Sequence, residues 1–112
     1  MSRVLLGITG GIAAYKTCEL VRLLTRAQHE VRVVATENAL RFVGRDALQA
    51  LSGHPVRCDL FDAAEESEIS HIALADWAEV VIVAPATAHT LARLAHGMAD
   101  DLLSTLCLAT RA

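Results

Sequence analysis

The chain has 112 residues, 54% of them hydrophobic but only 4% aromatic, and a formal net charge of −3. This length suits one domain, and the lack of a concentrated positive charge argues against a nucleic-acid partner. The apolar start over residues 4–8 is far shorter than the roughly 20 residues of a membrane span. The three cysteines match no metal motif, so we expect no metal site and reduced thiols in a cytoplasmic protein.

The first third of the chain alternates between strand and helix patterns. Residues 3–9 (RVLLGIT) predict a buried strand that ends in a glycine turn, and residues 12–28 carry the spacing of an amphipathic helix. Residues 31–35 (VRVVA) predict a second strand. Either Thr36 or Asn38 is expected to cap the helix that follows.

The remaining patterns continue the alternation as far as the last residue. In order they predict a helix over 39–51, an extended piece over 56–58, an acidic loop with one helical turn over 59–70, a helix over 70–77 capped by Ser70, a strand over 80–84, a helix over 87–96, and a last helix opened by Asp100 or Asp101. Such alternation indicates an α/β fold with a doubly wound parallel sheet in a three-layer α/β/α arrangement.

The two ends of the chain carry expectations of their own. Met1 is expected to be the true amino terminus. A further strand is expected after the last helix of a doubly wound fold. We therefore expect residues 1–112 to form one domain that is incomplete at its carboxyl end.

Three segments follow predicted strands, where open α/β sheets bind ligands. Gly7, Gly10 and Gly11 lie at a strand-to-helix turn that suits phosphate, although their spacing is neither GxGxxG nor a P-loop. Thr36 is either a helix cap or a ligand contact, and the neighbouring Glu37 would suit the ribose of NAD. The small residues over 84–90 (APATAHT) leave room for a planar ring, or simply form a capped helix.

His71 is the remaining candidate for chemistry. It lies just inside the predicted helix over 70–77. A histidine near neutral pH can act as acid, base or hydrogen-bond donor. A lone histidine is more often a surface residue or one with its hydrogen bonds satisfied, so both interpretations stay open.

Four motifs occur together in register, and together they are specific. They are ITGGIAAYK at 8–16, ISHIAL at 69–74, APATAHT at 84–90 and GMADDLL at 97–103. In this order and at these separations they resemble the homo-oligomeric flavin-containing cysteine decarboxylase family. The resemblance covers essentially the whole chain.

This resemblance implies a Rossmann-like flavoprotein domain that binds FMN rather than NAD. It makes His71 the active-site histidine, acting in substrate positioning or proton handling. It implies cofactor contacts in two sets, with phosphate and ribityl near Gly10, Gly11, Ile12 and Thr36, and the isoalloxazine near Thr87, Ala88, His89 and Thr90.

The implied function is FMN-dependent decarboxylation of 4′-phosphopantothenoylcysteine to 4′-phosphopantetheine in coenzyme A biosynthesis, by a trimeric or dodecameric carboxy-lyase. A fused phosphopantothenate–cysteine ligase domain is compatible with this function. The family's substrate-binding asparagine and flap cysteine motifs do not occur in these 112 residues, so we expect the chain alone to be inactive. The alternatives are a non-catalytic flavin-binding or regulatory subunit, and a relative of flavin prenyltransferases.

Overall fold

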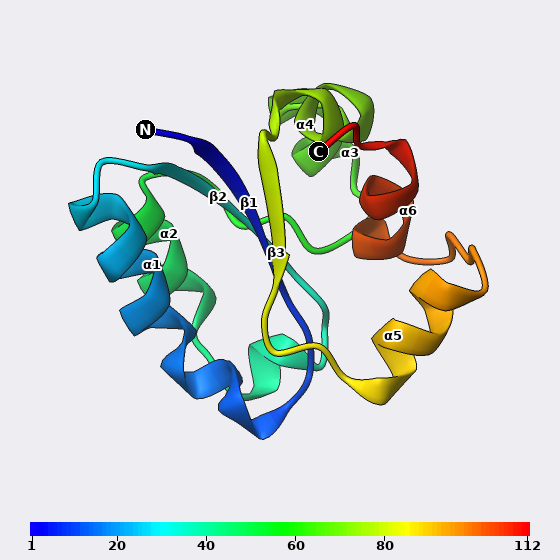
Figure 1. Ribbon diagram of the computed structural model, residues 1–112, viewed down its shortest axis with the longest axis horizontal. Helices are drawn as coiled ribbons and strands as arrows, with labels where there is room; N and C mark the ends of the chain where they lie inside the picture. The colour runs from blue at the N-terminus through cyan, green and yellow to red at the C-terminus, as the bar shows by residue number, and fades with distance from the viewer.

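A computed structural model describes the backbone of residues 1–112 and every side chain except that of Glu68. Its centre is a parallel sheet of three strands, β1 (Arg3–Ile8), β2 (Glu30–Ala35) and β3 (Val80–Val83), in the order β2-β1-β3. Helices lie on both sides of this sheet (Figure 1). The predicted α/β fold with a parallel sheet between helical layers is therefore confirmed.

The central strand β1 supplies apolar side chains to both layers. Val4, Leu6 and Ile8 belong to one buried cluster, whereas Leu5 belongs to the other. Successive side chains of a strand point to opposite faces of the sheet. A continuous aliphatic run therefore makes β1 the strand that is buried on both faces.

Each face of the sheet is covered by a pair of helices. On one face lie α1 (Thr17–Arg26) and α2 (Arg45–Ser52), and on the other lie α4 (His71–Trp77) and α6 (Leu102–Ala109). Half-buried Cys18 packs against the first cluster and half-buried Cys107 against the second. Both thiols are therefore small packing groups, as the helical patterns predict.

The two longest predicted helices are each divided in the structure. The first begins as a 3₁₀ helix, η1 (Ile12–Lys16), before α1, and the second is split into η2 (Ala39–Arg41) and α2. Gly44 separates the last two because its backbone is extended, with φ −77° and ψ 131°. The prediction of one continuous helix over 39–51 is wrong for this reason.

The extended piece predicted over 56–58 forms only an isolated bridge to β2, made by Arg57. The Arg57 amide donates to a β2 carbonyl at 3.0 Å, but the neighbouring amides have side-chain acceptors instead. Val56 N–H donates to Gln49 Oε1 at 3.0 Å, and Cys58 N–H donates to Glu65 Oε1 at 2.8 Å. These side-chain bonds replace the ladder of a fourth strand.

Side-chain caps begin four of the helices, including α3 (Ala63–Glu68) and α5 (Ala88–Ala95). The capping residues are Asp62, Ser70, Thr87 and Asp101. Ser70 and Asp101 are caps expected from the sequence. Asn38 is the residue before η2 but makes no side-chain cap bond, and the Thr36 hydroxyl instead accepts from Ala39 N–H at 3.2 Å. Within the part of the chain that the structure describes, no helix is long and apolar enough to cross a membrane.

Candidate functional site

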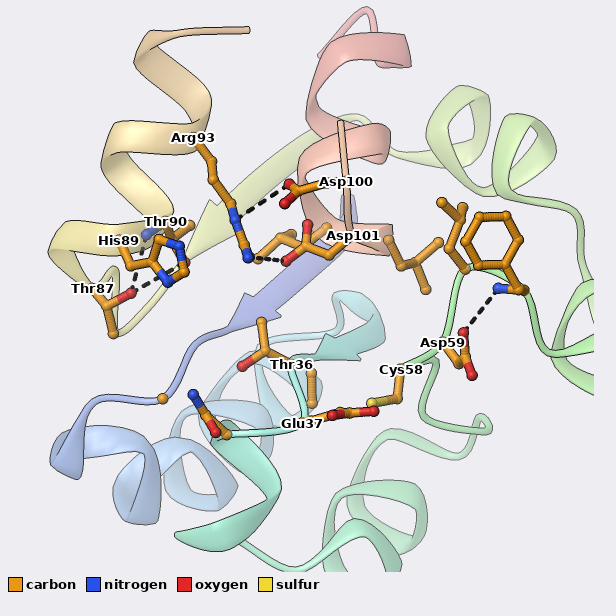
Figure 2. A pocket seen from close by; sticks show the side chains of 17 residues that line it. Thr36, Glu37, Cys58, Asp59, Thr87, His89, Thr90, Arg93, Asp100 and Asp101 are labelled. Carbon is orange, nitrogen blue, oxygen red and sulfur yellow. Dashed lines mark hydrogen bonds and ion pairs between the residues drawn. The ribbon is translucent and has the colours of Figure 1, made fainter. Parts of the chain in front are cut away.

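A cavity of about 430 Å³ lies beyond the carboxyl ends of the strands. Gly10, Thr36, Thr87, His89 and Thr90 all line it. Figure 2 shows Thr36 facing the cavity from the end of β2, and Thr87, His89 and Thr90 from the start of α5. Residues up to 80 positions apart in the sequence thus share one crevice because parallel strands end at the same edge.

Gly10 is required by a close approach of two loops. A Cβ at this position would lie 2.5 Å from Asn38 Cβ, closer than real Cβ contacts allow. The loop after β1 therefore packs directly against the loop after β2. This contact sets the width of the crevice between them, which is a role that the glycine motif alone did not reveal.

Thr9 joins the loop after β1 to the loop after β3. Its buried hydroxyl donates to Pro85 O at 2.5 Å and accepts from Thr87 N–H at 2.9 Å. Sequence reasoning missed this residue because it read Thr9 only as the end of a strand. The one signal was its place between the strand and the paired glycines.

The start of α5 offers hydrogen-bond donors to the cavity. Thr87 Oγ1 accepts from Thr90 N–H at 3.2 Å and caps the helix. The following amides, of Ala88 and His89, begin the helix, where no carbonyl one turn earlier is available to them. A helix amino terminus of this kind favours an anion or another strong acceptor.

Three predicted contact residues lie beside the cavity rather than among its lining residues as the structure describes them: Gly11, Ile12 and Ala88. A Cβ on Gly11 would lie 3.2 Å from the Pro85 ring, so this glycine lets two loops meet. Ile12 opens η1 with 77% of its surface exposed. Ala88 is the first residue of α5.

The cavity also has acidic residues in its lining. Glu37, Asp59, Asp100 and Asp101 line it together with a single guanidinium, that of Arg93. Figure 2 shows the Arg93 side chain directed at Asp100 and Asp101. Its Nη1 lies 2.6 Å from Asp101 Oδ2, and its Nε lies 3.3 Å from Asp100 Oδ1. The positive charge of Arg93 is thus already balanced by these two carboxylates of the same chain. The GMADDLL motif pointed to the aspartates, but nothing in the sequence pointed to Arg93.

Cys58 also lines the cavity, although the sequence gave it no role. Partial burial raises the pKa of its thiol; Arg45 works against this shift, while Glu65, Glu37 and Asp59 add to it. A raised pKa keeps the thiol protonated, so Cys58 has the properties of a wall residue rather than of a nucleophile.

His71 lies elsewhere, at the first position of α4, and does not belong to the lining as far as the structure describes it. Its ring is one-third exposed, and its Nδ1 lies 3.1 Å from Glu66 Oε1. The structure therefore brings five of the eight predicted cofactor residues into one cavity lining and holds the predicted catalytic histidine outside it. Among the described side chains, no group of three or more potential ligands is placed to bind a metal ion.

A parallel sheet with a glycine turn, hydroxyls and a helix amino terminus around one crevice defines a nucleotide- or flavin-binding α/β domain. The comparisons with known proteins narrow this class. The Flavoprotein family model matches residues 1–112, and the chain belongs to that family.

Relatives from the same comparisons agree with this assignment. The chain is 57% identical over 109 residues to the coenzyme A biosynthesis bifunctional protein CoaBC of Haemophilus influenzae, covering 97% of the chain and 27% of that protein. It therefore spans about a quarter of the length of this curated relative. The resemblance stated from the four motifs is confirmed at the level of the family.

Solved structures share the fold across the whole chain. The FMN-dependent cysteine decarboxylase SpaF superimposes with a TM-score of 0.85 at 33% identity, covering 99% of this chain and 64% of that one. A mutant PPC decarboxylase complexed with pantothenoylaminoethenethiol gives 0.79 at 32% identity, covering 98% and 61%.

Proposed function

We propose that this chain binds FMN in the cavity and forms the flavin-binding unit of a cytoplasmic decarboxylase. The reaction is the conversion of 4′-phosphopantothenoylcysteine to 4′-phosphopantetheine in coenzyme A biosynthesis. The observation that carries the proposal is the convergence of Gly10, Thr36 and Thr87, from the ends of three strands, on one cavity. The names of the relatives supply the substrate class.

The residues around the cavity fit FMN in size and in chemistry. The volume of about 430 Å³ lies within the range of roughly 300–1,000 Å³ typical of cofactor sites. A Cβ on Gly10 would push apart the loops that frame the cavity. Hydroxyls and helix-start amides provide neutral donors for phosphate, ribityl and ring heteroatoms.

The charged side chains that line the cavity indicate where the FMN phosphate would bind. The carboxylates of Asp59, Asp100 and Asp101 would repel a dianion, and Arg93 is already paired with two of them. We propose phosphate and ribityl contacts away from these three aspartates, at the turn of Gly10, Gly11 and Ile12 and at the Thr36 hydroxyl. The same proposal gives the ring to the segment 87–90, with Thr87, Ala88, His89 and Thr90.

When bound, FMN supplies the redox chemistry that makes loss of the carboxylate possible. The part assigned to His71 is to position the substrate or to exchange a proton with it. His71 lies outside the cavity of its own chain, as a site shared between copies of the chain would require. This supports the expected homo-oligomer, trimeric or dodecameric, as does the exposure of the apolar side chains of Ile12 and Tyr15 on η1, at 77% and 60%.

The chain covers 27% of its bifunctional relative. We therefore propose that residues 1–112 are the flavin-binding part of a domain that extends further, and that turnover also needs segments from the rest of the whole protein. The chain by itself is then expected to bind FMN without releasing CO₂. Any ligase activity of a whole protein would belong to those other segments.

A chimera tests the proposed function. Residues 1–112 replace the matching amino-terminal region of the Haemophilus influenzae CoaBC, and CO₂ and 4′-phosphopantetheine are measured with 4′-phosphopantothenoylcysteine as substrate. We expect the chimera to retain FMN and to turn over, and its His71→Asn variant to retain FMN but lose CO₂ release. A chimera that holds FMN but is inactive beside an active parent protein would favour the non-catalytic flavin-binding alternative.

A further inference from the structure

The His71 imidazole is held by one carboxylate from the preceding helix. Glu66 Oε1 lies 3.1 Å from His71 Nδ1, and the two Glu66 oxygens also lie 3.2 and 3.3 Å from the His71 backbone amide. Ring and backbone are therefore fixed to the same group. A carboxylate that contacts a histidine twice limits both the position and the rotation of the ring.

Glu66 is held in turn by Arg57. The Arg57 side chain is 3% exposed, and its Nη2 donates to Glu66 Oε2 at 3.1 Å. Its Nε donates to Glu65 Oε1 at 3.3 Å, and its Nη1 donates to the Ile69 carbonyl. A planar guanidinium with three separate acceptors has one orientation, so the Glu66 carboxylate is fixed from behind.

The backbone of Arg57 connects this cluster to the edge of the cavity. Its amide donates to Val33 O at 3.0 Å, and its carbonyl accepts from Ala35 N–H at 2.9 Å. Thr36, which lines the cavity, follows directly in the chain. Arg57 thus ties the end of β2 to the start of α4, although its side chain takes no part in the cavity lining that the structure describes.

The chemistry of the contact selects one form of the neutral imidazole. An ionised carboxylate only accepts hydrogen bonds, so His71 Nδ1 must carry the proton. The lone pair is then left on Nε2. We propose that Glu66 is a positioning residue that holds His71 in the Nδ1–H form, with Nε2 free to exchange a proton with the substrate, and that Arg57 holds Glu66 in place. The tautomer is a property of the chain itself, whereas the exchange with substrate rests on the proposed function.

The ionisation of Glu66 agrees with this arrangement. Partial burial would raise the pKa of its carboxyl, but the hydrogen bonds from His71 and Arg57 outweigh that effect and lower the pKa below its ordinary 4.5. Glu66 is therefore an anion near neutral pH. An anionic acceptor is what the Nδ1–H form requires.

The tautomer is measured by NMR on the full chain labelled with ¹⁵N-histidine, at a pH of about 8, where histidine is mainly neutral. The His71 signals are assigned with His71→Asn. We expect a protonated Nδ1 and an unprotonated Nε2 in the wild type, and a loss of the Nδ1–H form in Glu66→Ala. If Glu66→Ala does not fold, Glu66→Gln replaces it, with a mixture of both forms expected.

Glu65→Gln is the matched control. Glu65 shares the Arg57 guanidinium with Glu66, but it makes no contact with His71 among the described side chains. It should leave the His71 nitrogen signals in place. A wild-type ring protonated on Nε2, or nitrogen signals unchanged in Glu66→Ala, would overturn the proposal.

The CoaBC chimera gives the functional measurement. Glu66→Ala is expected to lower kcat by about 10- to 100-fold, part of the roughly 10²–10⁴-fold that general acid–base catalysis contributes, with FMN content and KM nearly unchanged. The NMR measurement and the kinetic measurement test different claims. A tautomer that depends on Glu66 in an inactive chimera would contradict the proposed function alone, whereas full activity of Glu66→Ala in an active chimera would contradict the positioning role.

Discussion

Two regions of the molecule are held by different forces. The cavity edge is where the loops after β1, β2 and β3 meet, at Thr9, Gly10 and Thr87. The His71 corner is the cluster of Arg57, Glu65, Glu66 and His71. At the cavity edge, the contacts are a hydroxyl, backbone groups and the close approach of Gly10 to Asn38. At the His71 corner, the contacts are charged, and Arg57 lies buried between carboxylates. Shape and neutral hydrogen bonds therefore join the loops after β1, β2 and β3 at the edge of the cavity, whereas ion pairs position the histidine.

This difference predicts that the two regions respond to different perturbations. Close packing changes abruptly when a single carbon is added, and it is indifferent to pH. A cluster of ion pairs depends on every charged member, because removing one partner leaves the others without compensation. Variants in the two regions should therefore separate FMN affinity from overall stability and from the state of His71.

The largest loss of stability is expected for Arg57→Met. It leaves Glu65 and Glu66 without their buried partner, which we expect to lower the free energy of unfolding by about 3 kcal/mol. Urea denaturation measures this change. In the control Arg22→Met, which removes an exposed pair with Glu19, the change should stay within about 0.5 kcal/mol. Equal losses in both variants would show that burial adds nothing to the Arg57 cluster.

Gly10→Ser should have its main effect on the cavity. Its Cβ must displace Asn38, at a cost of about 1–3 kcal/mol for overpacking, and we expect FMN affinity to fall by at least tenfold, or about 1.4 kcal/mol. Gly44→Ser is the control, because no described atom lies within 4 Å of the added Cβ and serine is a good helix cap there. A larger loss of FMN affinity in Arg57→Met than in Gly10→Ser would contradict the separation of the two regions.

Thr9→Val tests the hydroxyl that joins two cavity loops. The substitution removes both hydrogen bonds and leaves Thr87 N–H without its acceptor, at an expected cost of about 1–3 kcal/mol. Unfolding and FMN titrations should both register this loss. Thr25→Val removes an exposed hydroxyl bonded within its own helix, and its stability should change by no more than about 0.5 kcal/mol. Unaltered FMN affinity in Thr9→Val would remove Thr9 from the site.

The smallest effect is the dependence of stability on pH at Glu66. Because its pKa is lowered in the folded chain, the stabilisation is complete above the ordinary value of 4.5 and is lost as the pH falls through the lower folded value. The stability difference between the wild type and Glu66→Gln should therefore be constant near neutral pH and shrink below a pH of about 4.5. A difference that grows on acidification would contradict the ion pairing.

The sequence predicted what depends on local pattern. The three strands of the sheet, the caps at Ser70 and Asp101, and the convergence of Gly10, Thr36 and Thr87 follow from aliphatic runs, cap chemistry and the geometry of parallel sheets, whereas the extended piece expected over 56–58 forms only a bridge. It did not predict the roles of Thr9 and Arg93, because their partners are distant in the sequence or assembled only by folding. Arg57 shows the limit most clearly, since an arginine inside a short apolar segment gives no sign that it pairs with residues of the next helix.

The most direct test of the central claim is an equilibrium titration of the purified chain with FMN, followed by flavin absorbance and fluorescence. Saturation at one FMN per chain is expected, with much weaker binding by Gly10→Ser and wild-type affinity in Gly44→Ser. A folded chain that leaves the flavin spectrum unchanged, or equal binding by both glycine variants, would contradict the assignment of the cavity.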